Sequence, residues 1–571
     1  MMGGVLARFL HSPVPSWVPI IGDDEALPVY LYIKMLFSVA TFCFYHGVYA
    51  PDVEENAPPV GTPTLLCFNH SNGLTDATVL MRTFPRMIRF CAKDTLWRDP
   101  GIKTVMIKAS GAVPVKRKQE HGDNADNRGA MSAVSKALRA GQVVSIAPEG
   151  TSRMRTVLEP LKSGVGRMAV DAVVSALSEG LEDFKVHIVP CSIVYLHREK
   201  WRSNVLCSYC KNIVVDASFL KAFGVDASTT NPRDQKRGKA VHAIMAKLRS
   251  ELESNMLIAP HWQALRDGVT AGRIYRSDGA RIPLGDWIRI TRHFATTLSS
   301  QSPQLADRVR RYQEGLDALG IRDARIMQMQ KRRSQQKPPL IFLILKILIR
   351  LAMFLGYGTI ALPGSIFWLP TWVACKRAES KIIRRARKAA RDGAGKLLDE
   401  RYDFDTISET KMAVSFIMLN VTWFVAFVAS AAFLCSSIRQ AVLVSCVILP
   451  CLMWFTVRQV EEAFSSGRSC ISNMRLALAP RKSIRALIEI RRDLESDILA
   501  FAQKTEAPVP EPRSVKGRPR DGLWSESPFW NFVRYFSPLY RRKRDWTEVL
   551  RFGDDLTYLD FYESEAASPQ R

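Results

Sequence analysis

The sequence predicts an α/β domain with a mixed sheet flanked by helices, together with helices embedded in a membrane. Between residues 60 and 215, short apolar runs alternate with amphipathic patterns, which is typical of strands and helices that follow one another along a chain. Residues 412–434 contain no charged side chain, and such a helix can cross about 30 Å of hydrocarbon. At 571 residues the chain is also too long for a single hydrophobic core, so we expect several domains.

The local hydrophobic pattern predicts the individual elements of the α/β domain. Five apolar runs predict strands: TPTLLCF (62–68), GAVPV (111–115), GQVVSIAP (141–148), KVHIVPCSIVYL (185–196) and KNIVVDA (211–217). Residues 127–141 and 163–177 have the spacing of amphipathic helices. Strands that are mostly apolar indicate a largely buried sheet.

Three further segments of the chain are apolar. Residues 27–50 are apolar but carry Lys34 and His46, which leaves open whether they span the membrane or only dip into it. No cleavable signal precedes them, so we expect the protein to keep its N-terminus. Residues 441–457, with Pro450 inside, follow 412–434 after a short link, and the two runs predict a transmembrane helical hairpin.

The third segment, residues 340–375, is too long for one crossing. Helix-breaking residues interrupt it, which favours a re-entrant hairpin: Gly356, Gly358, Pro363 and Gly364. Lys346 and Arg350 lie on one helix face, so the first half can also lie at the interface. Basic segments 325–337 and 376–391 flank the region, and the positive-inside rule places both in the cytosol. We therefore expect an even number of crossings and a cytosolic region 51–338.

These patterns predict seven parts of the chain. They are an N-terminal membrane-associated segment (1–50), a catalytic domain (51–220), a helical insertion (221–338), a membrane or re-entrant hairpin (339–375), a basic cytosolic linker (376–411), a transmembrane hairpin (412–457), and a C-terminal cytosolic helical region with a flexible tail (458–571).

The amino-acid composition limits the kinds of molecule that the protein can bind. The 80 Lys and Arg residues against 55 Asp and Glu residues give a net charge of +25, which favours anionic partners such as nucleic acid, phosphorylated metabolites or acidic lipids. No recognisable nucleic-acid-binding module is present, and the apolar segments favour a membrane. Eleven cysteines are scattered, and Cys207 and Cys210 form the single CxxC, so we expect reduced thiols and no metal.

The stretch CFNHSNGLTDA (67–77) places His70 and Asp76 directly after an apolar run. Six positions apart, the two side chains meet neither on a continuous helix nor on a continuous strand. They can meet in a strand-to-helix turn if the helix begins near Thr75 and Asp76 lies in its first turn. A helix-capping Asp with an incidental His would give the same pattern, so the residues alone do not decide.

Three other turns carry polar residues after apolar runs. IAPEGTSR (146–153) has backbone N–H groups and hydroxyls that can hold a phosphate, GAVPVKRKQ (111–119) ends in basic residues, and VPCSIVYLHREKWRSN (189–204) places Pro190 before a basic rim. Each alone is equally well a polar or basic surface turn.

In the order His/Asp, Arg, Glu-Gly-Thr and Pro, these pieces resemble the motifs of the glycerolipid acyltransferases. The five-residue spacer of NHSNGLTD resembles the fungal dual-substrate glycerol-3-phosphate and dihydroxyacetone-phosphate acyltransferases, as do YLHREKWRS, LIAPHWQALRDGVTAGRIYR, DALGIRDAR and ALPGSIFWLP. The resemblance covers about residues 40–460. The chain differs at Ala147, where an aromatic residue is common, and at residues 151–153, where Gly-Ser-His is common.

The resemblance implies a glycerol-3-phosphate acyltransferase-like fold, with His70 and Asp76 as the catalytic pair. It implies substrate-binding roles for Arg117, Glu149, Gly150, Thr151, Ser152, Lys93 and Pro190. Because a carboxylate repels a phosphate, we expect Glu149 to hold an acceptor hydroxyl or to brace the loop. The lysophosphatidate sn-2 acyltransferases share these motifs, and a non-catalytic membrane scaffold of the same fold is a further alternative.

The expected reaction is acylation of the sn-1 hydroxyl of glycerol-3-phosphate or dihydroxyacetone phosphate by acyl-CoA, with no cofactor. The partners implied are these substrates and membrane lipids, without nucleic acid. The resemblance implies a multi-pass protein of the endoplasmic reticulum membrane whose catalytic domain is cytosolic.

Overall fold

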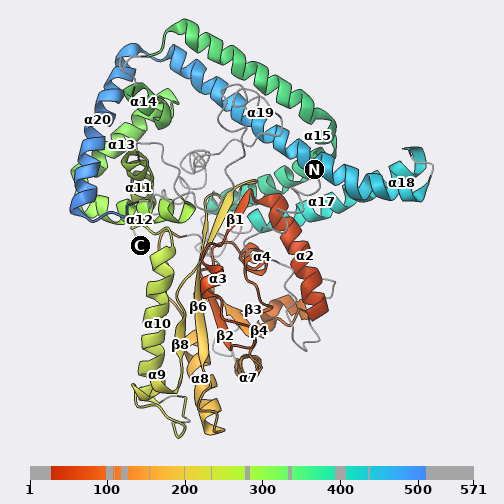
Figure 1. The fold of residues 1–571 in the computed structure, drawn as a ribbon, viewed down its shortest axis with the longest axis vertical. Helices are drawn as coiled ribbons and strands as arrows, with labels where there is room; N and C mark the ends of the chain where they lie inside the picture. The colour runs from red at the N-terminus through yellow and green to blue at the C-terminus, as the bar shows by residue number, and fades with distance from the viewer. Residues whose placement is uncertain are drawn as a thin grey trace, which may run out of the picture. The chain divides into compact units, whose positions relative to one another are not determined.

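The computed structural model describes residues 27–97, 107–108, 110–116, 127–152, 155–198, 200–229, 231–232, 234–276, 283–331, 337–391, 407–434 and 437–509. The chain divides into two compact units. Unit 1 runs to Ile258 and also includes residues 382–412, while unit 2 comprises residues 259–381 and the chain from Ala413 onward. Most of the elements of both are labelled in Figure 1.

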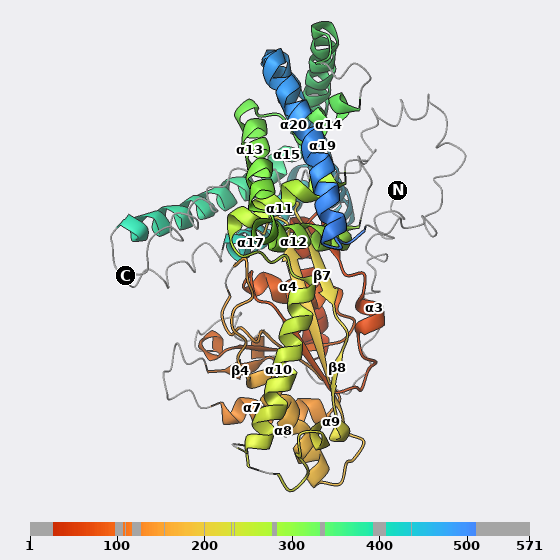
Figure 2. The same ribbon diagram turned by 90° about the vertical axis from the view of Figure 1, so that its left-hand side faces the viewer.

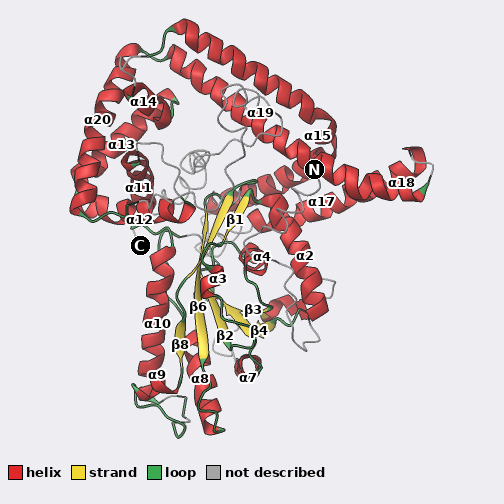
Figure 3. Ribbon diagram, in the orientation of Figure 1, coloured by secondary structure: helices red, strands yellow, loops and turns green. Residues whose placement is uncertain are grey.

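Unit 1 is built on one eight-stranded sheet in the described part of the chain (Figure 3, yellow). The strand order is β1-β7-β6-β2-β5-β3-β4, and β8 pairs with β6. The strands are β1 (Gly47–Tyr49), β2 (Thr64–Phe68), β3 (Ile88–Lys93), β4 (Val113–Val115), β5 (Val143–Ile146), β6 (Val186–Tyr195), β7 (Asn204–Tyr209) and β8 (Ile213–Val215). β6 pairs antiparallel with β7 and β8 whereas the remaining pairs are parallel, so the predicted mixed sheet is confirmed.

Alternation along the strands creates a separate core on each face of the sheet. In β2, Leu65 and Cys67 face one core, and Leu66 and Phe68 face the other. The helices of the first core are α7 (Arg128–Arg139), α8 (Gly164–Ser178) and α10 (Gln235–Asn255), with the short α9 (Ala217–Lys221) beside α8. Figures 1 and 2 show α8 and α10 alongside each other.

The second core lies under α4 (Leu74–Thr83) and the end of α2 (Leu27–Phe44), with the short α3 (Val53–Asn56) beside β7. A 3-10 turn, η1 (Asp94–Trp97), follows β3. Tyr30 and Ile33 of α2 are buried, and Lys34 donates to the Phe84 carbonyl at 3.3 Å. One face of α2 therefore belongs to unit 1, and Lys34 points into the protein.

The predicted boundary of the catalytic domain at residue 220 is wrong. α10 lies within the expected helical insertion, yet its apolar residues complete the first core: Ala240, Val241, Ile244, Leu248 and Leu252. Because these side chains are buried against the sheet domain, unit 1 extends to Ile258.

Unit 2 begins with a helical bundle. Its helices are α11 (Trp262–Tyr275), α12 (Leu284–Gln301), α13 (Pro303–Leu319), α14 (Asp323–Gln330) and α20 (Arg481–Lys504). The fully buried Arg491 of α20 contacts Asp323 of α14 at 2.9 Å, and Tyr312 of α13 donates to the same carboxylate at 2.6 Å. Burial opposes ionisation of Asp323, but Arg491 holds the pKa of this carboxyl below its ordinary value. The ion pair joins segments that lie 168 residues apart.

The expected re-entrant hairpin at residues 339–375 is not formed. One helix, α15, runs from Leu340 to Arg391 and also takes up the start of the predicted basic linker. Pro363 and Pro370 lie inside it. Proline and glycine are tolerated in apolar helices when neighbouring helices pack closely, and such a neighbour is present.

That neighbour is α19 (Leu449–Leu478), which lies antiparallel to α15 (Figure 1). Ile347 contacts Cys470, Gly364 lies against Thr456, and the Trp368 indole donates to the Met453 carbonyl at 3.0 Å. Lys337 binds the carbonyls of Ala477 and Ala479 at the end of α19. The contact extends over roughly 30 Å of helix.

Two more helical segments complete the apolar region. They are α17 (Ile407–Ala429), which continues into a π-helical turn at Ser430–Leu434, and α18 (Ile438–Leu443), which leads through Val444–Ile448 into α19. Trp423 donates to the Ser445 carbonyl at 3.1 Å, so the two runs predicted as a hairpin are in contact. In the described residues, three helices are long and apolar enough to cross a membrane: Leu340–Arg385, Ile407–Ala432 and Ile438–Leu478.

Candidate active site

The site lies where β2, β5 and β6 end. β2 pairs in parallel with β5 on one side and with β6 on the other, so their carboxyl ends meet at one edge. This edge brings together the turn after β2 (69–76), the turn after β5 (147–152) and the last residues of β6. Polar groups in loops beyond the ends of parallel strands are a common location for ligand sites.

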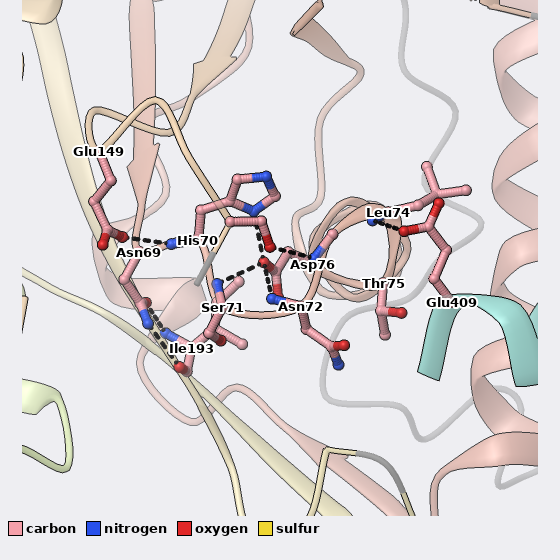
Figure 4. Close-up of polar contacts among 12 residues, drawn as sticks. Asn69, His70, Ser71, Asn72, Leu74, Thr75, Asp76, Glu149, Ile193 and Glu409 are labelled. Atoms are coloured by element: carbon pink, nitrogen blue, oxygen red, sulfur yellow. Dashed lines mark hydrogen bonds and ion pairs between the residues drawn. The ribbon is translucent and has the colours of Figure 1, made fainter. Parts of the chain in front are cut away.

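The turn after β2 has the geometry expected from its sequence. α4 begins at Leu74, and Gly73 has φ of +51°, which suits glycine. His70 Nδ1 lies 2.8 Å from Asp76 Oδ2. The predicted contact between the two side chains is confirmed, and Figure 4 shows the imidazole above the carboxylate.

Asp76 is fully buried and accepts hydrogen bonds on both oxygens. Besides His70, Oδ2 accepts from the backbone N–H of Ser71 at 3.1 Å and of Asn72 at 3.0 Å, and Oδ1 accepts from the Tyr195 hydroxyl at 2.6 Å. Burial and the charge of Asp76 raise the pKa of Tyr195, which keeps this phenol protonated as a donor. Because an ionised carboxylate can only accept hydrogen bonds, the proton between His70 and Asp76 must be on His70 Nδ1.

This assignment leaves His70 Nε2 with a lone pair. The His70 side chain is 15% exposed, so the ring is mostly enclosed but not sealed. The edge of the ring also contacts Phe68, with centroids 5.6 Å apart. Nε2 can therefore accept a proton from a hydroxyl group that enters the site.

Glu149 braces the same loop. Its Oε1 accepts from the His70 backbone N–H at 2.7 Å. Burial raises the pKa of Glu149 to about 7, and the hydrogen bond from His70 opposes this increase. Of the two roles expected for Glu149, the structure contains the loop contact.

The turn after β5 is held next to the turn after β2. Ser152 Oγ accepts from the Gly73 backbone N–H at 2.9 Å, and Thr151 is buried. Gly150 has φ of +69°, and the ammonium of Lys162 lies directly against it, 2.4 Å from the position a β-carbon would take. The turn thus places a cation beside Gly150, where an anion could be held.

The structure does not bring the remaining predicted substrate-binding residues together. Arg117 lies outside the described residues. Lys93 ends β3, in register with Val115 of β4, on the side of β5 away from β2. Pro190 is buried inside β6 opposite Cys67 and presents no polar side chain. Pro190 is thus a core residue of the strand, and its role in substrate binding stays a prediction.

Several residues at the site were not predicted. Tyr195 is the last residue of β6 and Arg198 lies three positions beyond it, where it donates to the Ser71 carbonyl. Asn69 exchanges two hydrogen bonds with the backbone of Ile193, at 3.0 and 2.7 Å. Their positions at the ends of β2 and β6 were a usable signal, since adjacent parallel strands end at the same edge. In the described ranges no group of three or more His, Cys, Asp or Glu side chains could hold a metal ion.

Comparisons with known proteins show that the chain is similar to acyltransferases. The family model described as Acyltransferase matches residues 51–194, and the one described as Glycerol-3-phosphate acyltransferase 2 C-terminal domain matches residues 269–508. Glycerol-3-phosphate O-acyltransferase 2 of Saccharomyces cerevisiae is 28% identical over 53% of this chain and 38% of its own length.

Two further relatives are similar over shorter stretches. An uncharacterised acyltransferase of Schizosaccharomyces pombe is 24% identical over 45% of this chain and 36% of its own length. Glycerol-3-phosphate O-acyltransferase 1 of S. cerevisiae is 23% identical over 44% of this chain and 31% of its own length. The chain thus matches about a third of the length of the curated relatives.

Proposed function

We propose that this chain, which resembles the glycerolipid acyltransferases, transfers an acyl group from acyl-CoA to the sn-1 hydroxyl of glycerol-3-phosphate or dihydroxyacetone phosphate. The product is lysophosphatidate or 1-acyl-dihydroxyacetone phosphate, together with free CoA. The hydrogen-bonded pair of His70 and Asp76 carries this proposal, because it supplies an oriented base at an open edge of the sheet.

The reaction follows from the orientation of the imidazole. His70 Nε2 takes the proton of the acceptor hydroxyl as its oxygen attacks the thioester carbonyl. The tetrahedral intermediate then expels the CoA thiolate, which takes the proton from the imidazolium. Asp76 stabilises the transient positive charge on the ring. A positioned base contributes about 10²–10⁴-fold, so the rest of the rate enhancement must come from binding the two substrates together.

The acceptor phosphate requires cations. We place it at the turn after β5, where Lys162 lies against Gly150 and Ser152 is in contact with the turn after β2. Arg117, two positions after the end of β4, would supply a guanidinium suited to a phosphate. Glu149, about half protonated at pH 7, repels a phosphate less than an ordinary carboxylate would.

The second candidate reaction is acylation of lysophosphatidate at sn-2, because the enzymes that catalyse it share the same sequence motifs. The match of residues 269–508 to a glycerol-3-phosphate acyltransferase C-terminal domain favours the sn-1 step. We also propose an endoplasmic reticulum location with the catalytic unit in the cytosol. Membrane-bound enzymes of this kind meet their amphiphilic substrates at high local concentration.

The proposal is tested with membranes that contain the full chain. Labelled acyl-CoA is supplied with glycerol-3-phosphate, dihydroxyacetone phosphate or lysophosphatidate in turn. We expect acylation of one or both of the first two acceptors and its loss in His70→Ala at unchanged protein level. Acylation of lysophosphatidate alone would establish the sn-2 alternative, and equal turnover by His70→Ala would exclude the base.

A further inference from the structure

The first turn of α17 lies against the turn that carries His70 and Asp76. Ser408 Oγ donates to the Arg198 carbonyl at 2.6 Å, and Arg198 in turn donates to the Ser71 carbonyl. Thr75 Oγ1 contacts the Met412 sulfur at 3.7 Å. Four side chains of residues 407–412 are buried: Ile407, Ser408, Lys411 and Met412. Met412 is part of the core that also contains Phe68.

Glu409 reaches the start of α4 from this turn. Its Oε2 accepts from the backbone N–H of Leu74 at 3.3 Å, across 335 residues of sequence (Figure 4). The same oxygen lies 2.5 Å from the position that a β-carbon on Gly73 would take. A β-carbon at position 73 would force the carboxylate to shift, and the positive φ of Gly73 also favours glycine.

α4 has no side-chain cap of its own. Its N-cap residue is Gly73, which has no side chain to bind the free N–H groups of the first turn. Ser152 accepts from the Gly73 N–H and Glu409 from the Leu74 N–H, so both acceptors come from distant parts of the chain. A carboxylate is favourable at a helix N-terminus. Asp76 lies two residues beyond Leu74, in the same turn.

We propose that Glu409 is a positioning residue of the active site. By binding the Leu74 N–H, it holds the first turn of α4 at the angle at which Asp76 meets His70 Nδ1. The segment that enters a candidate membrane helix thereby supports the catalytic pair. The effect on kcat rests on the proposed acyl transfer. The support of the first turn of α4 does not depend on that reaction.

The kinetic test compares Glu409→Ala, Glu409→Gln and the wild type as full chains in membranes. Loss of the acceptor should lower kcat by about three- to tenfold, with KM for both substrates unchanged, because the pair is misaligned while the binding groups stay in place. The Gln variant keeps an acceptor oxygen and should retain most of kcat. Glu489→Ala, an exposed residue of α20, is the control for loss of a carboxylate.

A second measurement is independent of activity. Hydrogen exchange of the purified full chain should show faster exchange of the Leu74 amide in Glu409→Ala than in the wild type and in Glu489→Ala. A wild type without acyltransferase activity would refute the proposed function, yet this exchange difference would still be expected.

Three results would overturn the positioning role. They are unchanged kcat in Glu409→Ala, equal exchange of the Leu74 amide in all variants, or a lower KM for the acceptor at constant kcat. The last result would mean that Glu409 occupies the anion site that the acceptor phosphate needs.

Discussion

At the scale of single residues, the hydrogen bonds of Asp76 explain how the site is organised. Its oxygens accept from one imidazole, two backbone N–H groups and one phenol. The backbone donors fix the carboxylate within its own turn. The Tyr195 hydroxyl binds the other oxygen and ties the turn to β6, so rotation of the carboxylate away from His70 would break a bond on each side.

Tyr195→Phe should therefore lower kcat without removing activity. Three donors to Asp76 remain, and loss of one hydrogen bond to a charged group costs about 1.5–3 kcal/mol, which corresponds to a decrease of roughly 10- to 100-fold. Steady-state kinetics with the preferred acceptor gives the value. Tyr32→Phe, at an exposed position of α2, is the matched control. An unchanged kcat in Tyr195→Phe would show that the backbone donors suffice.

Glu149 makes stability depend on pH. The unfolded carboxyl loses its proton near its ordinary pKa of 4.5, whereas the folded one keeps it to about 7. The folded state binds more protons between these values, so the contribution of Glu149 to stability is present below pH 4.5 and is lost as pH rises through 7.

Glu149→Gln removes this dependence while keeping an acceptor for the His70 N–H. Relative to the variant, the wild type should gain up to about 3 kcal/mol in the free energy of unfolding on going from pH 8 to pH 4.5. Thermal unfolding of both proteins in detergent across this range measures the difference. A constant difference would mean that Glu149 has an ordinary pKa in the folded protein.

At the scale of elements, the strands were easier to predict from sequence than the long helix. Each predicted strand of residues 60–215 was a short apolar run, and each is present because side-chain alternation and burial are local properties. Residues 88–93 and 204–209 mix polar with apolar positions, so the apolar pattern did not predict β3 and β7. Glycine and proline near residue 360 were read as breakers, but close packing against α19 permits a continuous helix.

The contact between α15 and α19 predicts opposite effects for two glycines of one helix. A β-carbon on Gly364 would lie 1.7 Å from Thr456 Oγ1, whereas one on Gly356 would meet nothing within 4 Å. Gly364→Ala should lower the unfolding temperature in detergent, because the helices must separate. Gly356→Ala should be neutral or stabilising, since alanine favours helix by about 1 kcal/mol. Equal effects at the two positions would contradict this packing.

At the scale of the whole molecule, packing within unit 2 limits how the chain can cross a membrane. α14 ends at Gln330 and α20 begins at Arg481, yet the two pack together through Asp323 and Arg491. Both ends of the intervening chain therefore lie on one side, and the number of crossings between them is even. Since three candidate spans lie between them, not all three cross once.

Membrane-impermeant maleimide tests this parity in sealed vesicles. Gln328→Cys and Lys482→Cys, both at exposed positions, should be labelled from the same side, with the wild-type chain as the background for native thiols. Labelling from opposite sides would mean an odd number of crossings and would contradict the packing of α14 on α20.

Contacts between segments that are distant in the sequence could not be predicted from it. The meeting of His70 with Asp76 follows from a single turn, so its geometry could be argued from spacing alone. The burial of α10 on the sheet and the approach of Glu409 to Leu74 depend on how the chain returns after many residues. Their sequences contain no periodic or motif signal that identifies the partner.

Because synthesis begins at the N-terminus, the contact of residues 407–412 with the turn after β2 can form only after the sheet has been made. A ribosome that has passed residue 258 has produced α10 and every described strand of the sheet, but codons 407–412 are still to be read. A product that terminates early would fold the sheet and lack the segment that covers Gly73 and Thr75. Premature stop codons between these points should therefore yield a folded but catalytically impaired fragment.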